Sequence, residues 1–326
     1  MREKLAPVRS VLRAVGAARR AALGVAAAGL LIGGCGFGPS QLNAAAFVNG
    51  TEIPLGQVHG QLLTVLAKEG PQARAQLEAG HQLDDISRKI LTVRIRHQLL
   101  DIAARRAGVT VDSARVNRLI TEVGGAEAAS KGTIYDANGY RQRAKDQLLM
   151  AALGRSALHS SAVTVDYTTA DTRTAAKQRV EQLSLAGPKA ARQSIDADVR
   201  AGKDAELGKR IVAADDPVFA TTPAFGVAEG TVVAFQLEDT KPWVIMVVKN
   251  RTTRGVQPSD HAPQIDQIDP VVLEAIGLRQ LALVGEDGGV RLNPRYGVWD
   301  PVSLQVVSDE NETGGFVAPL RATART

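Results

Sequence analysis

This chain of 326 residues contains a single cysteine, Cys35, so no disulfide can form within it. Its fold must therefore depend on the burial of apolar side chains. Aromatic residues make up only 4% of the sequence, which leaves Leu, Ile, Val and Ala to supply the core. About 290 residues follow Cys35, enough for one large domain or two of moderate size.

Cys35 directly follows an apolar run, AALGVAAAGLLIGG, that has the features of a secretory signal. Such a signal has a basic segment, a short apolar segment and small residues at the cleavage site. The basic residues are Arg2, Lys4, Arg9, Arg13, Arg19 and Arg20. The sequence Ile32-Gly33-Gly34-Cys35 resembles a bacterial lipobox, in which the thiol receives a diacylglyceryl group. Cleavage between Gly34 and Cys35 would make residues 1–34 the signal peptide of a lipoprotein.

The apolar run is shorter than the ~20 apolar residues that a membrane-spanning helix needs. Two acyl chains, such as palmitate, suffice for stable attachment where one chain is marginal. We therefore expect lipid anchoring at Cys35, on the extracytoplasmic face of the cell membrane. Two alternatives stay open at this point. Cys35 could be a buried structural thiol, and Arg19-Arg20 could belong to a twin-arginine signal.

The formal charge of +5 comes entirely from this N-terminal segment. Removing its six basic residues and its one acidic residue, Glu3, leaves 33 of each sign. A basic chain would suggest nucleic acid or an anionic surface as partner. The balanced remainder excludes nucleic acid as the expected partner.

Beyond a tether at 35–44, the apolar pattern predicts a first region made mostly of helices. A strand at Phe47-Val48 precedes the turn signal Asn49-Gly50. Apolar residues at helical spacing then predict helices over 55–67, 83–107, 112–123 and 139–158. For the helix at 83–107, acidic residues at the start and basic residues at the end match the helix dipole.

After residue 160 the pattern changes to a mixture of strands and helices. Alternating residues predict a strand at 163–167, and two helices follow at 173–185 and 190–209. Further strands are predicted at 232–236, 243–249, 290–292 and 298–299, and a helix at 270–284. Residues 304–326 are polar and aperiodic, so we expect a disordered tail there. The predicted fold class is α+β.

Two segments resemble a known family, AAFVNGTEI at 45–53 and VRLNPRYGVWD at 290–300. With the long helices between them, they resemble SurA-like and PrsA-like exported chaperones, and in particular the actinobacterial lipoproteins with a SurA N-terminal domain. The resemblance covers about 45–300. It implies a discontinuous helical chaperone domain, 45–160, completed by 264–303. It also implies an inserted parvulin-like module at 161–256, and pairing between the strands at Phe47-Val48 and Val290–Leu292.

The chemistry of the module departs from the family. Parvulins carry histidines on their first and last core strands, but no histidine or cysteine lies between His159 and His261. Where the closing strand would carry one, this chain has Trp243 to Val248, an apolar run. Rotation about a peptide bond faces a barrier of ~20 kcal/mol. The sequence therefore predicts a module without catalytic residues, with prolyl isomerase activity as the alternative.

Other candidate residues were weighed for catalysis or ligand binding. His59, His81, His97, His159 and His261 are scattered, which argues against a metal site. The acidic pairs are Asp215-Asp216 and Asp196/Asp198. They are candidates for a catalytic carboxylate site, and the simpler interpretation is that they are solvated surface. No nucleophile-elbow or phosphate-binding glycine pattern is present. Three aromatic residues either bind clients or pack in the core, namely Tyr296, Trp299 and Trp243. We expect no cofactor, no metal and no small-molecule substrate.

These observations predict a lipid-anchored chaperone, a holdase that binds unfolded or exported polypeptides without catalysis. The apolar faces of the helices serve either a groove for clients or a closed core, and only exposure separates the two. A second alternative is a scaffolding lipoprotein that binds one folded partner.

Overall fold

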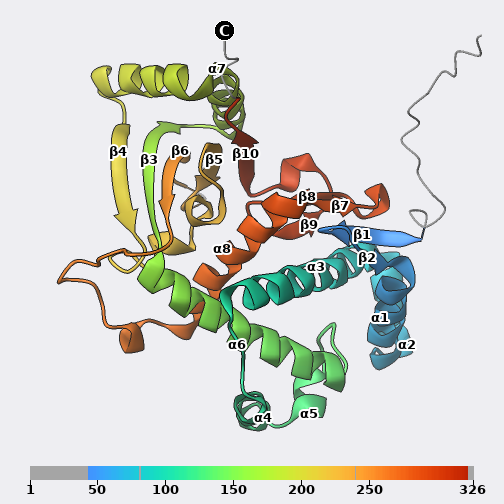
Figure 1. Ribbon diagram of the computed structural model, residues 1–326. Helices are drawn as coiled ribbons and strands as arrows, with labels where there is room; N and C mark the ends of the chain where they lie inside the picture. Colours follow the sequence, from blue (N-terminus) through green and yellow to red (C-terminus); the bar gives the residue numbers. More distant parts are fainter. Residues whose placement is uncertain (1–42, 81, 239, 322–326) are drawn as a thin grey trace, which may run out of the picture. The chain divides into compact units, whose positions relative to one another are not determined.

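The computed structural model describes residues 43–80, 82–238 and 240–321 (Figure 1). They belong to one compact unit, 39–326. The signal at 1–34, Cys35 and His81 lie outside the described residues. Within those described, no helix combines the length and apolar character needed to cross a bilayer.

Helices and antiparallel strands occur largely in separate runs along the chain, in agreement with the predicted α+β class. The helices are α1 (Leu55–Lys68), α2 (Pro71–Ala79), α3 (Leu83–Ala107), α4 (Ser113–Glu122), α5 (Ala126–Ser130), α6 (Ala137–Ser160), α7 (Arg173–Arg200) and α8 (Pro270–Gly288). The strands are β1 (Ala44–Val48), β2 (Thr51–Pro54), β3 (Ala162–Ala170), β4 (Glu206–Val212), β5 (Thr231–Gln236), β6 (Trp243–Thr252), β7 (Val290–Leu292), β8 (Val298–Asp300), β9 (Gln305–Val307) and β10 (Gly315–Pro319). Short 3₁₀ turns are η2 (Phe219–Thr221), η3 (Pro223–Gly226), η4 (Ile265–Gln267), η5 (Pro294–Tyr296) and η6 (Glu310–Glu312).

A small sheet joins segments that lie far apart in the sequence. Its strand order is β2-β1-β7, and Phe47 pairs with Arg291 across the β1–β7 register. The predicted pairing of Phe47-Val48 with Val290–Leu292 is therefore confirmed. Asn49 and Gly50 connect β1 to β2 with φ angles of 48° and 80°. Both angles are positive, as a two-residue hairpin turn requires.

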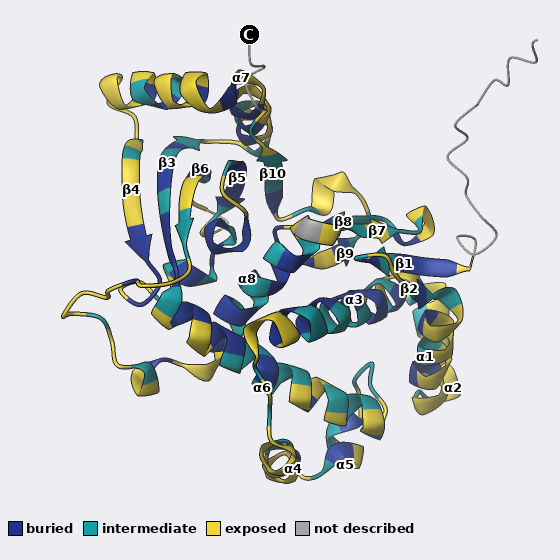
Figure 2. Ribbon diagram, in the orientation of Figure 1, coloured by how far each residue is buried: buried dark blue, intermediate teal, exposed yellow. Residues whose placement is uncertain are grey.

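Helices α1 to α6 form one part of the molecule, which we call the helical part. Helix α3 lies at its centre, and the ends of α3 follow from the sequence. Asp84 and Asp85 occupy its first turn, Arg105 and Arg106 its last, and Gly108 ends it in the left-handed conformation at φ 64°. Its buried face contains Ile90, Leu91, Ile95, Leu99 and Leu100 (Figure 2). These residues pack in one core with strand β1 and with residues of α6 and α8.

Helices α6 and α8 cross at very short distance. A Cβ atom added at Gly154 would lie 1.8 Å from the carbonyl oxygen of Leu273. One added at Gly277 would lie 1.9 Å from the carbonyl oxygen of Met150. Only glycine fits at both positions, because the two backbones are in contact there. Both helices supply residues to the core around α3 and to a second core beneath the large sheet.

The large sheet is antiparallel, with strand order β10-β5-β6-β3-β4. Alternate residues of its strands face opposite sides, and both sides are covered. Val232 and Ile245 pack in the core with α7. Val233 and Met246 pack in the core that contains η2, η3, α6 and α8 residues. This double burial explains why β5 and β6 read as continuous apolar runs.

The prediction of a disordered tail from 304 is wrong for the residues described, up to 321. Strand β10 pairs with β5 along five positions, from Gly315 opposite Phe235 to Pro319 opposite Thr231. The Phe316 ring lies 5.7 Å from that of Trp243. A short strand inside a polar segment has little periodicity, so its partner in the sheet determines its structure.

The two helices predicted at 173–185 and 190–209 are joined in α7. Gly187 has non-helical angles (φ 73°, ψ 173°) and is followed by Pro188, which kinks the element. The helix ends at Arg200, and Gly202 is left-handed at φ 72°. The predicted end at Lys209 was therefore too late, because residues 206–212 pair with β3 as strand β4. Helix α2 was not predicted.

Candidate functional site

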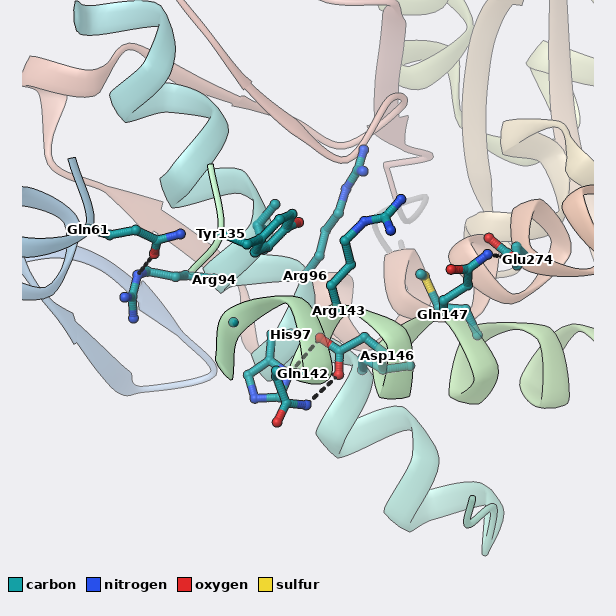
Figure 3. Close-up of a pocket in the computed structure, with 14 residues that line it drawn as sticks. Gln61, Arg94, Arg96, His97, Tyr135, Gln142, Arg143, Asp146, Gln147 and Glu274 are labelled. Atoms are coloured by element: carbon teal, nitrogen blue, oxygen red, sulfur yellow. Dashed lines mark hydrogen bonds and ion pairs between the residues drawn. The ribbon is translucent and has the colours of Figure 1, made fainter. Parts of the chain in front are cut away.

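The best-formed hollow lies among helices of the helical part (Figure 3). It has a volume of about 330 Å³. Its lining residues are Gln61 of α1, Val93, Arg94, Arg96, His97 and Leu100 of α3, Tyr135, Gly139, Gln142, Arg143, Asp146, Gln147 and Met150 of α6 and the loop before it, and Glu274 of α8. We call this hollow the cleft.

The spacing of these residues explains how two regular helices form the walls. On α3, Val93, Arg96, His97 and Leu100 recur every three or four positions, which places them on one face. The lining residues of α6 recur in the same way. Apolar side chains and polar groups therefore face one space, the composition usual for ligand sites.

The loop carrying Tyr135 is held against α1. Gln61 donates to the carbonyl oxygen of Ile134 at 3.0 Å. Lys68 donates to the carbonyl oxygen of Tyr135 and, at 3.4 Å, to that of Thr133. Residue Asp136 then caps α6 by accepting from the Gly139 backbone at 2.6 Å. These contacts fix the Tyr135 ring at the cleft.

A hydrogen-bonded group spans the cleft from α3 to α6. The Nδ1 atom of His97 lies 3.0 and 3.1 Å from the two carboxylate oxygens of Asp146. Gln142 donates to the same carboxylate at 2.8 Å. The hydrogen bond with Asp146 raises the pKa of His97 above its usual value, against the smaller opposing effect of burial. Asp146 is thereby occupied from two sides.

The second carboxylate of the cleft also has a partner. Gln147 donates to Glu274 at 2.8 Å. Burial raises the pKa of Glu274, while this hydrogen bond and the charge of Arg143 act in the opposite direction.

Three arginines line the cleft, and their partners are neutral. Arg94 donates to Gln61 at 3.0 Å and to Gln57 at 2.7 Å. Arg96 donates to the carbonyl oxygens of Leu304 and Ser303, at 2.8 and 3.0 Å. The guanidinium of Arg143 lies 5.3 Å from the Tyr140 ring centroid, and its contact with that hydroxyl is long, at 3.4 Å.

A second hollow, of about 340 Å³, adjoins the cleft along α1. The two share Gln61, Arg94 and Gly139 in their linings. The second hollow is otherwise lined by residues of α1 and by Asp136. The two hollows therefore adjoin at these residues, and we call the pair of hollows the groove.

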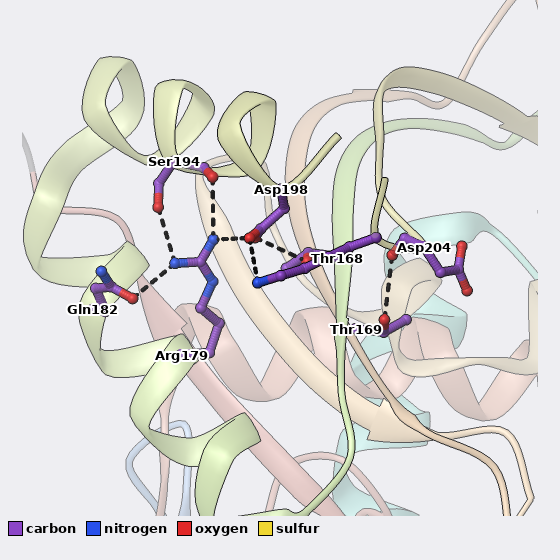
Figure 4. A network of polar contacts seen from close by, with 8 residues as sticks. Thr168, Thr169, Arg179, Gln182, Ser194, Asp198 and Asp204 are labelled. Atoms are coloured by element: carbon purple, nitrogen blue, oxygen red, sulfur yellow. Dashed lines mark hydrogen bonds and ion pairs between the residues drawn. The ribbon is translucent and has the colours of Figure 1, made fainter. Parts of the chain in front are cut away.

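Two carboxylates at the large sheet, by contrast, are paired with cations of the same chain. Asp198 of α7 accepts from Arg179, from Lys203 at 2.7 Å and from Thr168 at 3.0 Å (Figure 4). Burial acts to raise the pKa of Asp198, but the hydrogen bond from Lys203 and the charge of Arg179 hold it below its usual value. Asp198 is buried, so its interpretation as solvated surface is wrong.

Asp166 of β3 is the other buried carboxylate of this part, with 1% exposure. It accepts from Arg192 at 2.9 and 3.0 Å and from the Gly208 backbone at 2.7 Å, and Lys249 lies 3.7 Å away. These contacts tie β3 to α7, β4 and β6, which is a structural role. The sequence analysis did not single out this residue.

The remaining acidic candidates serve local structure. Asp215 accepts from the Ser259 backbone at 2.8 Å, and Asp216 from the Phe219 backbone at 2.9 Å. Asp196 forms an exposed pair with Arg200 at 3.1 Å. The two acidic pairs therefore do not converge on one site.

The candidate aromatic residues belong to separate cores. Trp243 packs in the core beneath α7, whereas Tyr296 and Trp299 pack in the core around α3. Core packing therefore accounts for them. Among the described histidines, His97 alone lines the cleft, and His59, His159 and His261 are exposed. No group of three or more His, Cys, Asp or Glu side chains within 43–80, 82–238 and 240–321 is placed to hold a metal.

Among the residues that line the cleft, sequence reasoning considered His97 alone as a candidate, as one of five scattered histidines. It missed Tyr135, Arg143 and Asp146, which the spacing of polar residues on α6 would have grouped on one face. That face opposes α3 only through tertiary packing.

No family model matches this sequence, and no curated protein matches it. The structure is similar to a crystal structure of the foldase protein PrsA from Lactococcus lactis, with a TM-score of 0.28 and 10% sequence identity. The similarity covers 77% of this chain and 95% of that one. A TM-score this low supports no inference about function.

Proposed function

We propose that this protein is an extracytoplasmic chaperone, a holdase that binds unfolded or exported polypeptides in the cleft without catalysing their isomerisation. The observation that carries the proposal is the groove between α1, α3 and α6, which exposes apolar and hydrogen-bonding groups together. Extended polypeptide offers both kinds of group. The resemblance of residues 45–53 and 290–300 to SurA-like and PrsA-like chaperones supports the same conclusion.

We further propose that residues 161–256 are a parvulin-like module that has lost catalysis. The strand–helix–strand order of β3, α7 and β4, followed by β5 and β6, supports this correspondence. The absence of histidine between His159 and His261 supports the loss of catalysis. Both faces of the sheet are covered by other elements. Isomerisation would require groups that stabilise the twisted amide more than its planar forms.

The first experiment measures light scattering by a chemically denatured model protein on dilution, with and without the purified mature chain. We expect suppressed aggregation. The variant Gln142→Trp should reduce suppression several-fold, because the indole fills the cleft. Lys145→Trp is the matched control, since Lys145 is exposed on α6 and does not line the cleft.

A protease-coupled assay on a prolyl peptide completes this experiment. We expect the prolyl bond of the peptide to isomerise at its uncatalysed rate. Acceleration that is lost on mutation within 161–256 would instead establish a prolyl isomerase. If the wild-type chain binds no unfolded client, the holdase proposal fails and a scaffold for one folded partner replaces it.

We also propose that the mature protein is anchored through acyl chains on Cys35, after cleavage behind Gly34. The apolar run before Cys35 and the basic residues before that run support this proposal. Cys35→Ala should move the protein out of the membrane pellet. Retention of this variant in the pellet after a high-salt wash would refute lipid anchoring.

A further inference from the structure

The cleft has an excess of positive charge that the protein does not neutralise. Arg94, Arg96 and Arg143 line it together with two carboxylates, Asp146 and Glu274. Within the described residues, none of the three guanidinium groups has a carboxylate within 4.0 Å. Asp146 is occupied by His97 and Gln142, and Glu274 by Gln147. The nearest acidic groups are thus already engaged elsewhere.

Arg96 of α3 and Arg143 of α6 both line the cleft together with Tyr135 (Figure 3). The charge of each acts to lower the pKa of Tyr135, although burial raises it overall. Arg96 is anchored by two carbonyl oxygens, which leaves part of its guanidinium without a protein acceptor. Arg143 is exposed on α6, and its contacts are with the neutral side chains of Tyr135 and Tyr140. Two guanidinium groups so placed form a receptor for a carboxylate, which accepts charge-assisted hydrogen bonds from both.

We propose that the cleft selects client segments that carry an Asp or Glu side chain next to apolar residues, with the carboxylate bound between Arg96 and Arg143. The neighbouring apolar side chains would contact Val93 and Met150 of the lining. This inference rests on the proposed function, because it specifies which polypeptides the cleft binds.

The shape of the groove favours an internal acidic residue over a free C-terminal carboxylate. The cleft adjoins the second hollow at Gln61, Arg94 and Gly139. Each hollow has the volume typical of a small-ligand site. A chain that places its carboxylate in the first hollow therefore has room to continue through the second.

The test uses fluorescence anisotropy with the full mature chain and nine-residue peptides that are acetylated and amidated at their ends. One peptide has Glu between Leu and Phe residues, and its partner has Gln there. We expect the Glu peptide to bind about tenfold more tightly, a difference in line with charge-assisted hydrogen bonds. The preference should shrink at high salt, because part of the cleft is open to solvent.

Arg143→Gln should abolish the preference for Glu, by lowering the affinity of the Glu peptide to about that of the Gln peptide. Arg141→Gln is the control, since Arg141 is exposed on the same helix outside the cleft. A third peptide carries Gln at the centre and a free C-terminal carboxylate. If this peptide alone binds tightly, the cleft captures chain ends and the proposal is overturned.

Two further results separate this inference from the proposed function. Equal affinity for the Glu and Gln peptides overturns the acidic preference and leaves the holdase intact. Suppression of client aggregation without binding of either peptide places the client site elsewhere, which also overturns the inference. Failure of both the peptide and the aggregation measurements would refute the holdase itself.

Discussion

Two buried carboxylates beside the large sheet and the three arginines of the cleft differ in the charge of their partners. In the sheet, Asp166 and Asp198 each receive at least one cation and further donors from the same chain. In the helical part, the arginines of the cleft have neutral partners. Charges that are paired internally connect elements to one another. Charged groups that keep unused hydrogen-bond donors can bind a ligand. We therefore propose the client site in the helical part.

The two parts also differ in how their elements pack. Residues of the sheet alternate between two covered faces, which leaves few side chains for other purposes. Helices α3 and α6 meet along only part of their surfaces, and the cleft opens where polar residues line both. Helices α6 and α8 belong to the cores of both parts.

The largest effect on stability is expected at the crossing of α6 and α8, the two helices that belong to the cores of both parts. Gly154→Ala should lower the free energy of unfolding by about 3 kcal/mol or more, because its methyl group would overlap the Leu273 carbonyl. Gly60→Ala on α1 is the control, since nothing lies within 4 Å of its added Cβ. That change should stabilise by up to about 1 kcal/mol. Urea unfolding measures both, and a fully stable Gly154→Ala would contradict the backbone contact.

An intermediate effect tests whether the polar network of the sheet is structural. Asp166→Asn should cost about 2 kcal/mol, because a buried carboxylate with charged donors is replaced by a neutral amide. Client binding by the folded variant should stay unchanged. Asp196→Asn, which removes an exposed pair with Arg200, should cost less than about 0.5 kcal/mol. Loss of client binding by a folded Asp166→Asn would assign function to the sheet as well.

The smallest effect concerns His97, the histidine of the cleft. The pKa of His97 is raised in the folded state, so its contribution to stability is present below its unfolded pKa. That contribution disappears as pH rises through the higher folded pKa. The stability difference between wild type and His97→Gln should therefore be larger at pH 6 than at pH 9. The change should be at most about 1 kcal/mol, because the His97 side chain is 33% exposed.

The exposed His159 supplies the control for this measurement. His159→Gln should change the free energy of unfolding by less than about 0.5 kcal/mol. A difference for His97→Gln that grows toward alkaline pH would contradict the assigned pairing with Asp146.

Local sequence determined much of this protein. Apolar periodicity and terminal charges were enough to predict α3 and α6, and the motif Asn49-Gly50 was enough for the β1–β2 turn. The lack of histidine between His159 and His261 is also a property of the sequence alone. These features depend on residues that are near one another in the chain, where spacing and composition carry the physical information.

Tertiary structure decided the rest, because the deciding contacts join distant residues. Strand β10 exists through its pairing with β5, although its own segment reads as polar tail. Asp198 is buried by an approach of Arg179, Lys203 and Thr168 that no local pattern signals. The cleft likewise forms only when α6 is brought against α3, since each helix alone presents an ordinary solvated polar face.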